Sequence, residues 1–230
     1  MRTALSSLLG VGLLVLAYGT AHADGADILK SQCSACHALM PPSDNSLDRV
    51  RSRKAPDLSY AGVKFKREWL VEWLQKPSAI RPAGYPYFKD VAPGEKHDEV
   101  DKSKLKEHLR LSKDDAKAAA DALMALKGPE GLVEAGLFKD EKPNLRMGEM
   151  AFVKLRGCSA CHEGKGGEGG MSGPALTDAG KRLQPDFIAS YIKNAQKIDP
   201  HVWMPAQPLS DQDIQRLTGY IVQLSSEEKK

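Results

Sequence analysis

Two copies of one five-residue motif, CSACH, constrain this chain of 230 residues more than any other feature. The first copy spans residues 33–37 and the second spans residues 158–162, so the copies begin 125 residues apart. The four cysteines of these motifs are the only cysteines in the chain. Identical filler residues in both copies indicate an internal duplication, and every thiol must be explained by the motifs themselves.

The arrangement C-x-x-C followed directly by His is the signature of covalent haem attachment. Both thiols form thioethers with the haem, and the histidine then ligates the iron. A zinc site would need its second ligand pair nearby, and a redox dithiol needs no histidine after each pair. We therefore expect two covalently attached haem c groups. The residues that hold them are Cys33, Cys36, Cys158 and Cys161, with His37 and His162 as proximal iron ligands.

Residues 1–23 have the pattern of a secretory signal peptide. Arg2 supplies the positive charge, residues 5–16 form a short apolar run, and residues 21–23 read Ala-His-Ala, a cleavage signal. The apolar run is shorter than the roughly 20 residues that a membrane-spanning helix needs. We expect export, cleavage before Asp24, and no transmembrane span in the mature chain.

The two halves of the chain share the same order of predicted helices and loops around the motif. A short helix precedes each motif, a proline-containing loop follows it, and then come apolar segments of helical period at residues 69–74 and 187–192. Ser112 and Ser210 each begin a C-terminal helix, with Asp three residues later as in a capping box. No alternating strand pattern of useful length occurs, so the predicted fold class is all-α. The predicted domains span residues 24–127 and 144–230, joined by a linker at residues 128–143.

On these motifs each half resembles a class I cytochrome c domain, and the whole chain resembles a periplasmic dihaem cytochrome c. The resemblance implies a few helices wrapped around each haem. It also implies haem attachment outside the bacterial cytoplasmic membrane, which fits the signal peptide. In this family the proline of the loop after the motif holds a carbonyl near the proximal histidine, a role that falls to Pro56 and Pro174.

The second iron ligand of each haem decides between electron transfer and chemistry. In the second half Met204 lies in a Trp-Met-Pro sequence 42 residues after His162. The resemblance implies that a Met-Pro pair at this place supplies the distal thioether. A thioether ligand raises the reduction potential.

The first half has no methionine at the corresponding place, residues 81–88. An insertion at residues 89–110 follows, and it carries His97 and His108. His108 precedes the helix start at Ser112 much as Met204 precedes Ser210, so His108 is the first candidate and His97 its alternative. Four other possibilities remain for the second ligand of the first haem: Tyr85, no protein ligand at all, Met40 or Met124, and a residue from the second half.

The favoured function is one-electron transfer between periplasmic or membrane redox proteins, as a shuttle or as the cytochrome subunit of a dehydrogenase. The alternative is a haem enzyme, a peroxidase or a sulfur-compound oxidoreductase, that uses an open haem in the first half. A net charge of +3 does not suggest nucleic acid as a partner. Local basic clusters could still form a docking patch for an acidic partner. They comprise Arg49, Arg51, Arg53, Lys54, Lys64, Lys66 and Arg67.

Overall fold

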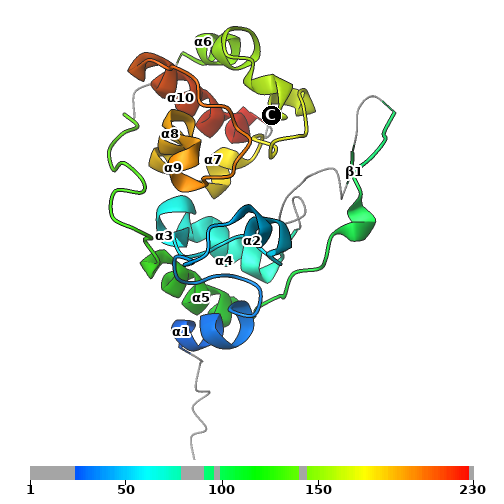
Figure 1. The fold of residues 1–230 in the computed structure, drawn as a ribbon, viewed down its shortest axis with the longest axis vertical. Coiled ribbons are helices and arrows are strands. Elements are labelled where there is room, and N and C mark those ends of the chain that lie inside the picture. The colour runs from blue at the N-terminus through cyan, green and yellow to red at the C-terminus, as the bar shows by residue number, and fades with distance from the viewer. Residues whose placement is uncertain (1–23, 79–90, 96–98, 140–143, 228–230) are drawn as a thin grey trace, which may run out of the picture.

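The computed structural model describes residues 24–78, 91–95, 99–139 and 144–227. Its helices form two groups that lie one above the other in Figure 1, and a short hairpin projects from the lower group. The predicted signal peptide, together with Tyr85 and His97, lies outside the described residues. The helical architecture agrees with the all-α prediction.

The first helical group contains α1 to α5 together with the hairpin. Its longest helix, α5, packs against both α1 and α4. The bounds are α1 Gly25–Ile28, the π-helix η1 Leu29–Cys33, α2 Leu47–Ser52, α3 Ala61–Lys64, α4 Arg67–Gln75, β1 Val91–Ala92, β2 Glu99–Val100, the 3-10 helix η3 Lys102–Lys104 and α5 Lys113–Ala125.

The second helical group contains α6 to α10 in the same order of parts. Its long C-terminal helix, α10, packs against α6, α7 and α8. The bounds are α6 Leu145–Met150, the π-helix η4 Ala151–Leu155, the 3-10 helices η5 Cys158–Ala160 and η6 Lys165–Gly167, α7 Ala179–Arg182, α8 Pro185–Lys193, α9 Ala195–Ile198 and α10 Asp211–Glu227.

Serine caps begin the two long helices, as the sequence predicts. The Ser112 hydroxyl accepts a hydrogen bond from the Asp115 N–H at 3.2 Å, and the Ser210 hydroxyl accepts one from the Asp213 N–H at 3.1 Å. Each aspartate carboxylate in turn accepts from the serine hydroxyl. Both caps therefore satisfy a backbone N–H that a helix start would otherwise leave unpaired.

Each group has its own core, and a glycine allows a close helix contact in each. A Cβ on Gly62 would collide with the Met124 carbonyl of α5, and a Cβ on Gly180 would collide with the Val222 carbonyl of α10. The matched positions support the duplication that the motifs indicate. Core side chains include Ile28, Leu70, Leu74 and Leu123 in the first group, and Phe152, Ile188, Leu217 and Ile221 in the second.

The two groups meet through a symmetric backbone contact. Phe65, just after α3, forms an antiparallel bridge with Leu183, just after α7. Because α3 and α7 occupy the same place in the two groups, equivalent residues of the two groups meet in this contact. Flanking hydrogen bonds run from the Lys66 N–H to the Arg182 carbonyl at 2.8 Å and from the Gln184 N–H to the Lys64 carbonyl at 2.9 Å.

Side chains reinforce this contact from both sides. The Gln184 amide donates to the carbonyls of Gly62 and Phe65, each at 2.9 Å. The Lys66 amine donates to the Gly180 carbonyl at 2.7 Å. These bonds pair backbone carbonyls that the helix ends leave unsatisfied, so the contact fixes the groups relative to each other.

The predicted linker is fixed along the second group over its described part. The Asp186 carboxylate accepts hydrogen bonds from the N–H groups of Gly136 and Phe138, at 2.8 and 2.9 Å. Lys193 forms an ion pair with Glu134 at 2.7 Å. This stretch, green at the left of Figure 1, therefore runs along the second group and is bonded to it.

Two-residue strands occur in the insertion of the first half, where the sequence predicted none. Val91 pairs with Val100 and Ala92 with Glu99 in an antiparallel hairpin. The chain returns from the hairpin through His108 to α5. Among the described residues, no helix is both long enough and apolar enough to cross a membrane.

Candidate haem sites

A π-helical turn leads into each cysteine motif. In the first group η1 ends at Cys33, and in the second η4 ends three residues before Cys158. The first cysteine of each motif is half-buried and the second, Cys36 or Cys161, is exposed. Burial raises the pKa of both Cys33 and Cys158. The two motifs therefore present their thiols in matching environments.

The histidines of the two motifs are oriented by the prolines that the family resemblance named. His37 Nδ1 lies 2.7 Å from the Pro56 carbonyl, and His162 Nδ1 lies 2.8 Å from the Pro174 carbonyl. A carbonyl can only accept, so Nδ1 carries the proton in both rings and Nε2 is the nitrogen that can ligate a metal. Carbonyl hydrogen bonds of this kind orient metal-binding histidines. The prediction for Pro56 and Pro174 is confirmed.

The environment of His37 favours the neutral imidazole that a metal requires. Burial lowers the pKa of His37, and the neighbouring His108 lowers it further. The hydrogen bond to Pro56 and the nearby Asp57 oppose these effects only in part.

His108 lies beside His37. The two ring centroids are 6.1 Å apart and the ring planes are inclined by 55°. Imidazole nitrogens bind metals at about 2 Å and the ring centre lies about 1 Å further out, so two imidazoles on opposite sides of one metal ion have centroids roughly 6 Å apart. His108 Nδ1 lies 2.8 Å from the Leu109 carbonyl, which assigns its proton to Nδ1 as in His37.

Met204 lies on the loop between α9 and α10 and is half-buried. The Gln196 amide donates to the Met204 carbonyl at 2.6 Å. Gln207, further along the loop, donates to the Arg156 carbonyl at 3.0 Å, two residues before Cys158. These bonds tie the methionine loop to α9 and to the start of the second haem motif. Neither glutamine stands out in the sequence, because the partners of both are backbone carbonyls, which carry no residue signal.

The loop after the second motif packs closely on His162. A Cβ on Gly173 would lie 2.5 Å from His162 Cε1, so only glycine fits there. Gly173 also donates its N–H to the Cys161 carbonyl at 2.6 Å. The loop that carries Pro174 is therefore seated on the motif, and this fixes the orientation of the ring.

The other methionines considered for the first haem have different environments. Met40 is 77% exposed, three residues after His37. Met124 packs against the core of the first group. Of the candidates in the described residues, His108 is the one that an interaction places beside His37.

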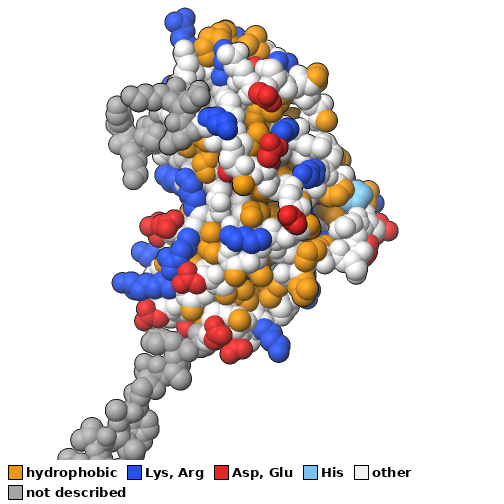
Figure 2. Space-filling view, turned by 90° about the vertical axis from the view of Figure 1, so that its left-hand side faces the viewer, with side chains coloured by type: hydrophobic (Ala, Val, Ile, Leu, Met, Phe, Trp, Pro, Cys, Tyr) orange, Lys and Arg blue, Asp and Glu red, His pale blue; other side chains and the backbone are white. Residues whose placement is uncertain are grey.

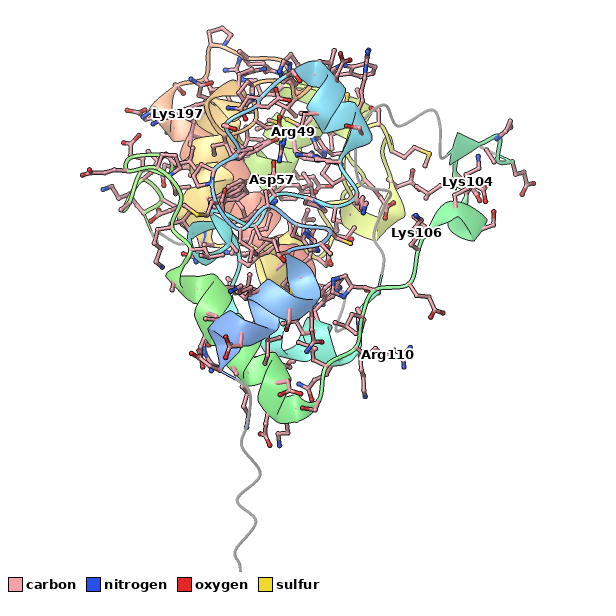
Figure 3. The ribbon with its side chains drawn as sticks, turned by 60° about the horizontal axis from the view of Figure 1, so that its bottom comes forward. Arg49, Asp57, Lys104, Lys106, Arg110 and Lys197 are labelled. Carbon is pink, nitrogen blue, oxygen red and sulfur yellow. The ribbon has the colours of Figure 1, made fainter. Side chains whose placement is uncertain are left out.

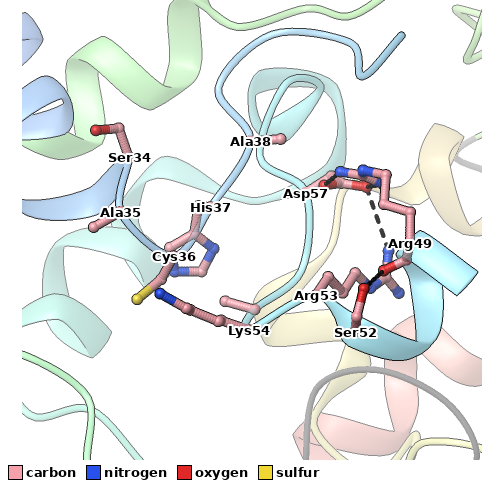
Figure 4. A pocket seen from close by; sticks show the side chains of 11 residues that line it. Ser34, Ala35, Cys36, His37, Ala38, Arg49, Ser52, Arg53, Lys54 and Asp57 are labelled. Atoms are coloured by element: carbon pink, nitrogen blue, oxygen red, sulfur yellow. Dashed lines mark hydrogen bonds and ion pairs between the residues drawn. The ribbon is translucent and has the colours of Figure 1, made fainter. Parts of the chain in front are cut away.

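The basic clusters of the sequence mostly serve the fold. In a pocket lined by the first motif, Arg49 and Arg53 both pair with Asp57, at 2.5 and 3.3 Å (Figure 4). Figure 3 shows Arg49 and Asp57 close together. Arg67 pairs with Asp121. On the face drawn in Figure 2, Lys and Arg side chains are interspersed with Asp and Glu. These arginines therefore lend no support to a docking patch.

Lys64 is enclosed between the two groups. Its amine lies 5.5 Å from the ring centre of Tyr60, 5.1 Å from that of Phe65 and 5.6 Å from that of Phe187. Burial is the main cause that lowers the pKa of Lys64 to about 8, and repulsion from Arg182 is the next largest cause. The cation–π contacts offset part of the cost of burying this amine.

These arrangements fit covalent haem. Each motif offers two thiols and an imidazole whose Nε2 can ligate iron, and in the first group a second imidazole lies at the separation expected across a metal ion. The helical fold and the two motifs are those that a c-type haem protein requires.

The comparison with protein families agrees for the second half. The model of the family described as cytochrome C oxidase, cbb3-type, subunit III, matches residues 143–221, about one third of the chain. The matched region includes the second motif, Met204 and most of α10. No curated protein and no solved structure matches the chain. Residues 143–221 are therefore a c-type cytochrome domain, which carries covalently bound haem.

Proposed function

We propose that this protein is a dihaem c-type cytochrome that transfers single electrons between extracytoplasmic redox partners. The observation that carries the proposal is the pairing of His37 with His108, whose ring centroids are 6.1 Å apart. A first haem held by two imidazoles has no open position for a substrate, which favours a carrier over an enzyme. When bound, each haem supplies reversible one-electron chemistry at its iron.

The proposed domains are residues 24–127 and 144–230, each with one haem. The first haem is held by Cys33 and Cys36 and ligated by His37 and His108. The second is held by Cys158 and Cys161 and ligated by His162 and Met204. Because a thioether ligand gives a higher potential than a second imidazole, electrons should pass from the first haem to the second.

Residues 1–23 are proposed to direct export to the bacterial periplasm. Donor and acceptor are then periplasmic or membrane redox proteins. The bridge between Phe65 and Leu183 supports a mechanism within one chain, because it holds the two domains in a fixed relative position. Transfer between the haems would then not depend on diffusion of one domain toward the other.

The test is a spectroscopic redox titration of the exported protein. The proposal expects two haems per chain and two one-electron steps. Met204→Ala should lower the potential of the upper step only. His108→Ala should alter the lower step only and should allow the reduced first haem to bind CO, while the alternative ligand His97, changed to Ala, should leave both steps unaltered.

Other results would overturn parts of the proposal. One haem per chain would refute the dihaem assignment. Stoichiometric CO binding by the unaltered protein would indicate an open haem and would favour the enzyme reading. Loss of the lower step in His97→Ala would transfer the ligand role to His97.

A further inference from the structure

Three aromatic rings form a stack that leads to His108. Phe65 precedes α4, and Trp69 and Trp73 follow at intervals of four residues on one side of the helix. Ring centroids are 5.3 Å apart between Phe65 and Trp69, and 5.6 Å apart between Trp69 and Trp73. Both separations are in the range of favourable aromatic pairs.

Trp73 is the member of the stack that contacts the proposed ligand. Its ring centroid lies 4.6 Å from that of His108, with the planes inclined by 58°. Its Nε1–H donates to the Ser78 carbonyl at 3.1 Å. Stacking on Trp69 and the bond to Ser78 fix the indole, so it forms a rigid wall against the imidazole.

The two imidazoles of the first site are twisted relative to each other. Their planes are inclined by 55°. His37 cannot turn freely because Pro56 holds its Nδ1. His108 lies on the return of the insertion, and its Nδ1 is hydrogen-bonded to the carbonyl of the next residue, Leu109. A bond to the adjacent residue does not tie the ring to the body of the domain, whereas the contact with Trp73 does.

We propose that Trp73 is a positioning residue that sets the plane of the His108 ring and keeps this ring on the iron of the first haem. The inference rests on the proposed function. Groups that touch a ligating histidine orient it and tune the metal. A ligand imidazole can rotate about its bond to the metal, and a packed indole removes that freedom.

The second domain supports the same reasoning by contrast. Bridged residues Phe65 and Leu183 align the two halves, and Tyr191 then falls at the position of Trp73. The proposed ligand of that domain is Met204, a thioether with no ring plane to set. In the first domain, where the proposed ligand is a histidine, the residue at this position is a tryptophan whose ring contacts that ligand. In the second domain the proposed ligand has no ring, and the residue at this position is a tyrosine.

The test is low-temperature EPR of the ferric holoprotein, because the angle between two axial imidazole planes sets the g-value anisotropy of a low-spin haem. Trp73→Leu should shift the g-values of the first haem or broaden its signal, and leave those of the second haem unchanged. Trp73→Phe should give an intermediate or native signal. In the reduced state, Trp73→Leu should bind CO at the first haem at least about 10-fold faster.

Tyr191→Phe is the matched control. It changes the aromatic residue that falls at the position of Trp73 in the second domain, and should leave the g-values of the first haem in place. Native g-values and native CO binding in a folded Trp73→Leu protein would overturn the role of Trp73. If the unaltered protein shows no bis-imidazole signal, the proposed ligation by His108 fails instead, so the two failures are distinguishable.

Discussion

Gln184 tests the contact between the two helical groups. Its amide donates to the carbonyls of Gly62 and Phe65, each at 2.9 Å. Gln184→Ala removes both bonds and keeps the backbone bond from the Gln184 N–H to the Lys64 carbonyl. A hydrogen bond contributes about 1 kcal/mol to stability, so the change should cost about 2 kcal/mol. For a chain of this size that corresponds to a fall in Tm of about 4–8 °C.

The assay is thermal unfolding of the ferric holoprotein, followed separately at each haem by its absorbance. In the unaltered protein both haems should report one transition. In Gln184→Ala the transitions should separate, because the lost bonds join the groups. Gln75→Ala is the matched control, since its amide donates within α4 to the Val71 carbonyl. Coincident transitions at the native Tm in Gln184→Ala would refute the assigned role of this contact.

Two further predictions concern the second domain. Burial raises the pKa of Asp213, but hydrogen bonds from Ser210 and the ion pair with Arg156 outweigh it and hold that pKa below its ordinary value. Asp213 therefore contributes stability above the unfolded pKa that is lost as pH falls through the lowered value. Asp213→Asn should lower the free energy of unfolding by about 1 kcal/mol at pH 7, measured by chemical denaturation. This difference from the unaltered protein should shrink below about pH 4, so a difference that does not change with pH would contradict the assignment. Gly173→Ala should displace His162 and lower the free energy of unfolding by about 1–3 kcal/mol. It should also shift the EPR signal of the second haem and leave the signal of the first haem unchanged. An unchanged second signal would show that the loop tolerates a side chain.

Much of the local structure follows from the sequence. Ser112 and Ser210 predict their helix starts because a cap is satisfied within one turn of the chain. The carbonyls of Pro56 and Pro174 meet the histidines as the family resemblance implied. These features depend on short segments or on spacing that covalent attachment imposes.

The long-range contacts could not be predicted in the same way. The bridge between Phe65 and Leu183 joins backbone atoms, which leave no compositional signal. The contact of Trp73 with His108 depends on the return path of an insertion that has no counterpart in the second half. From the sequence His108 was one of several candidates, and its separation from His37 is what raises it above them.

The most direct test of the central claim is the low-temperature EPR spectrum of the unaltered ferric protein. The account predicts two low-spin signals of equal intensity, one from a haem with two imidazoles and one from a haem with imidazole and thioether. His108→Ala should remove only the first signal, and Met204→Ala only the second. A stoichiometric high-spin signal in the unaltered protein would contradict the account, because it would mean that the first haem lacks a protein ligand opposite His37.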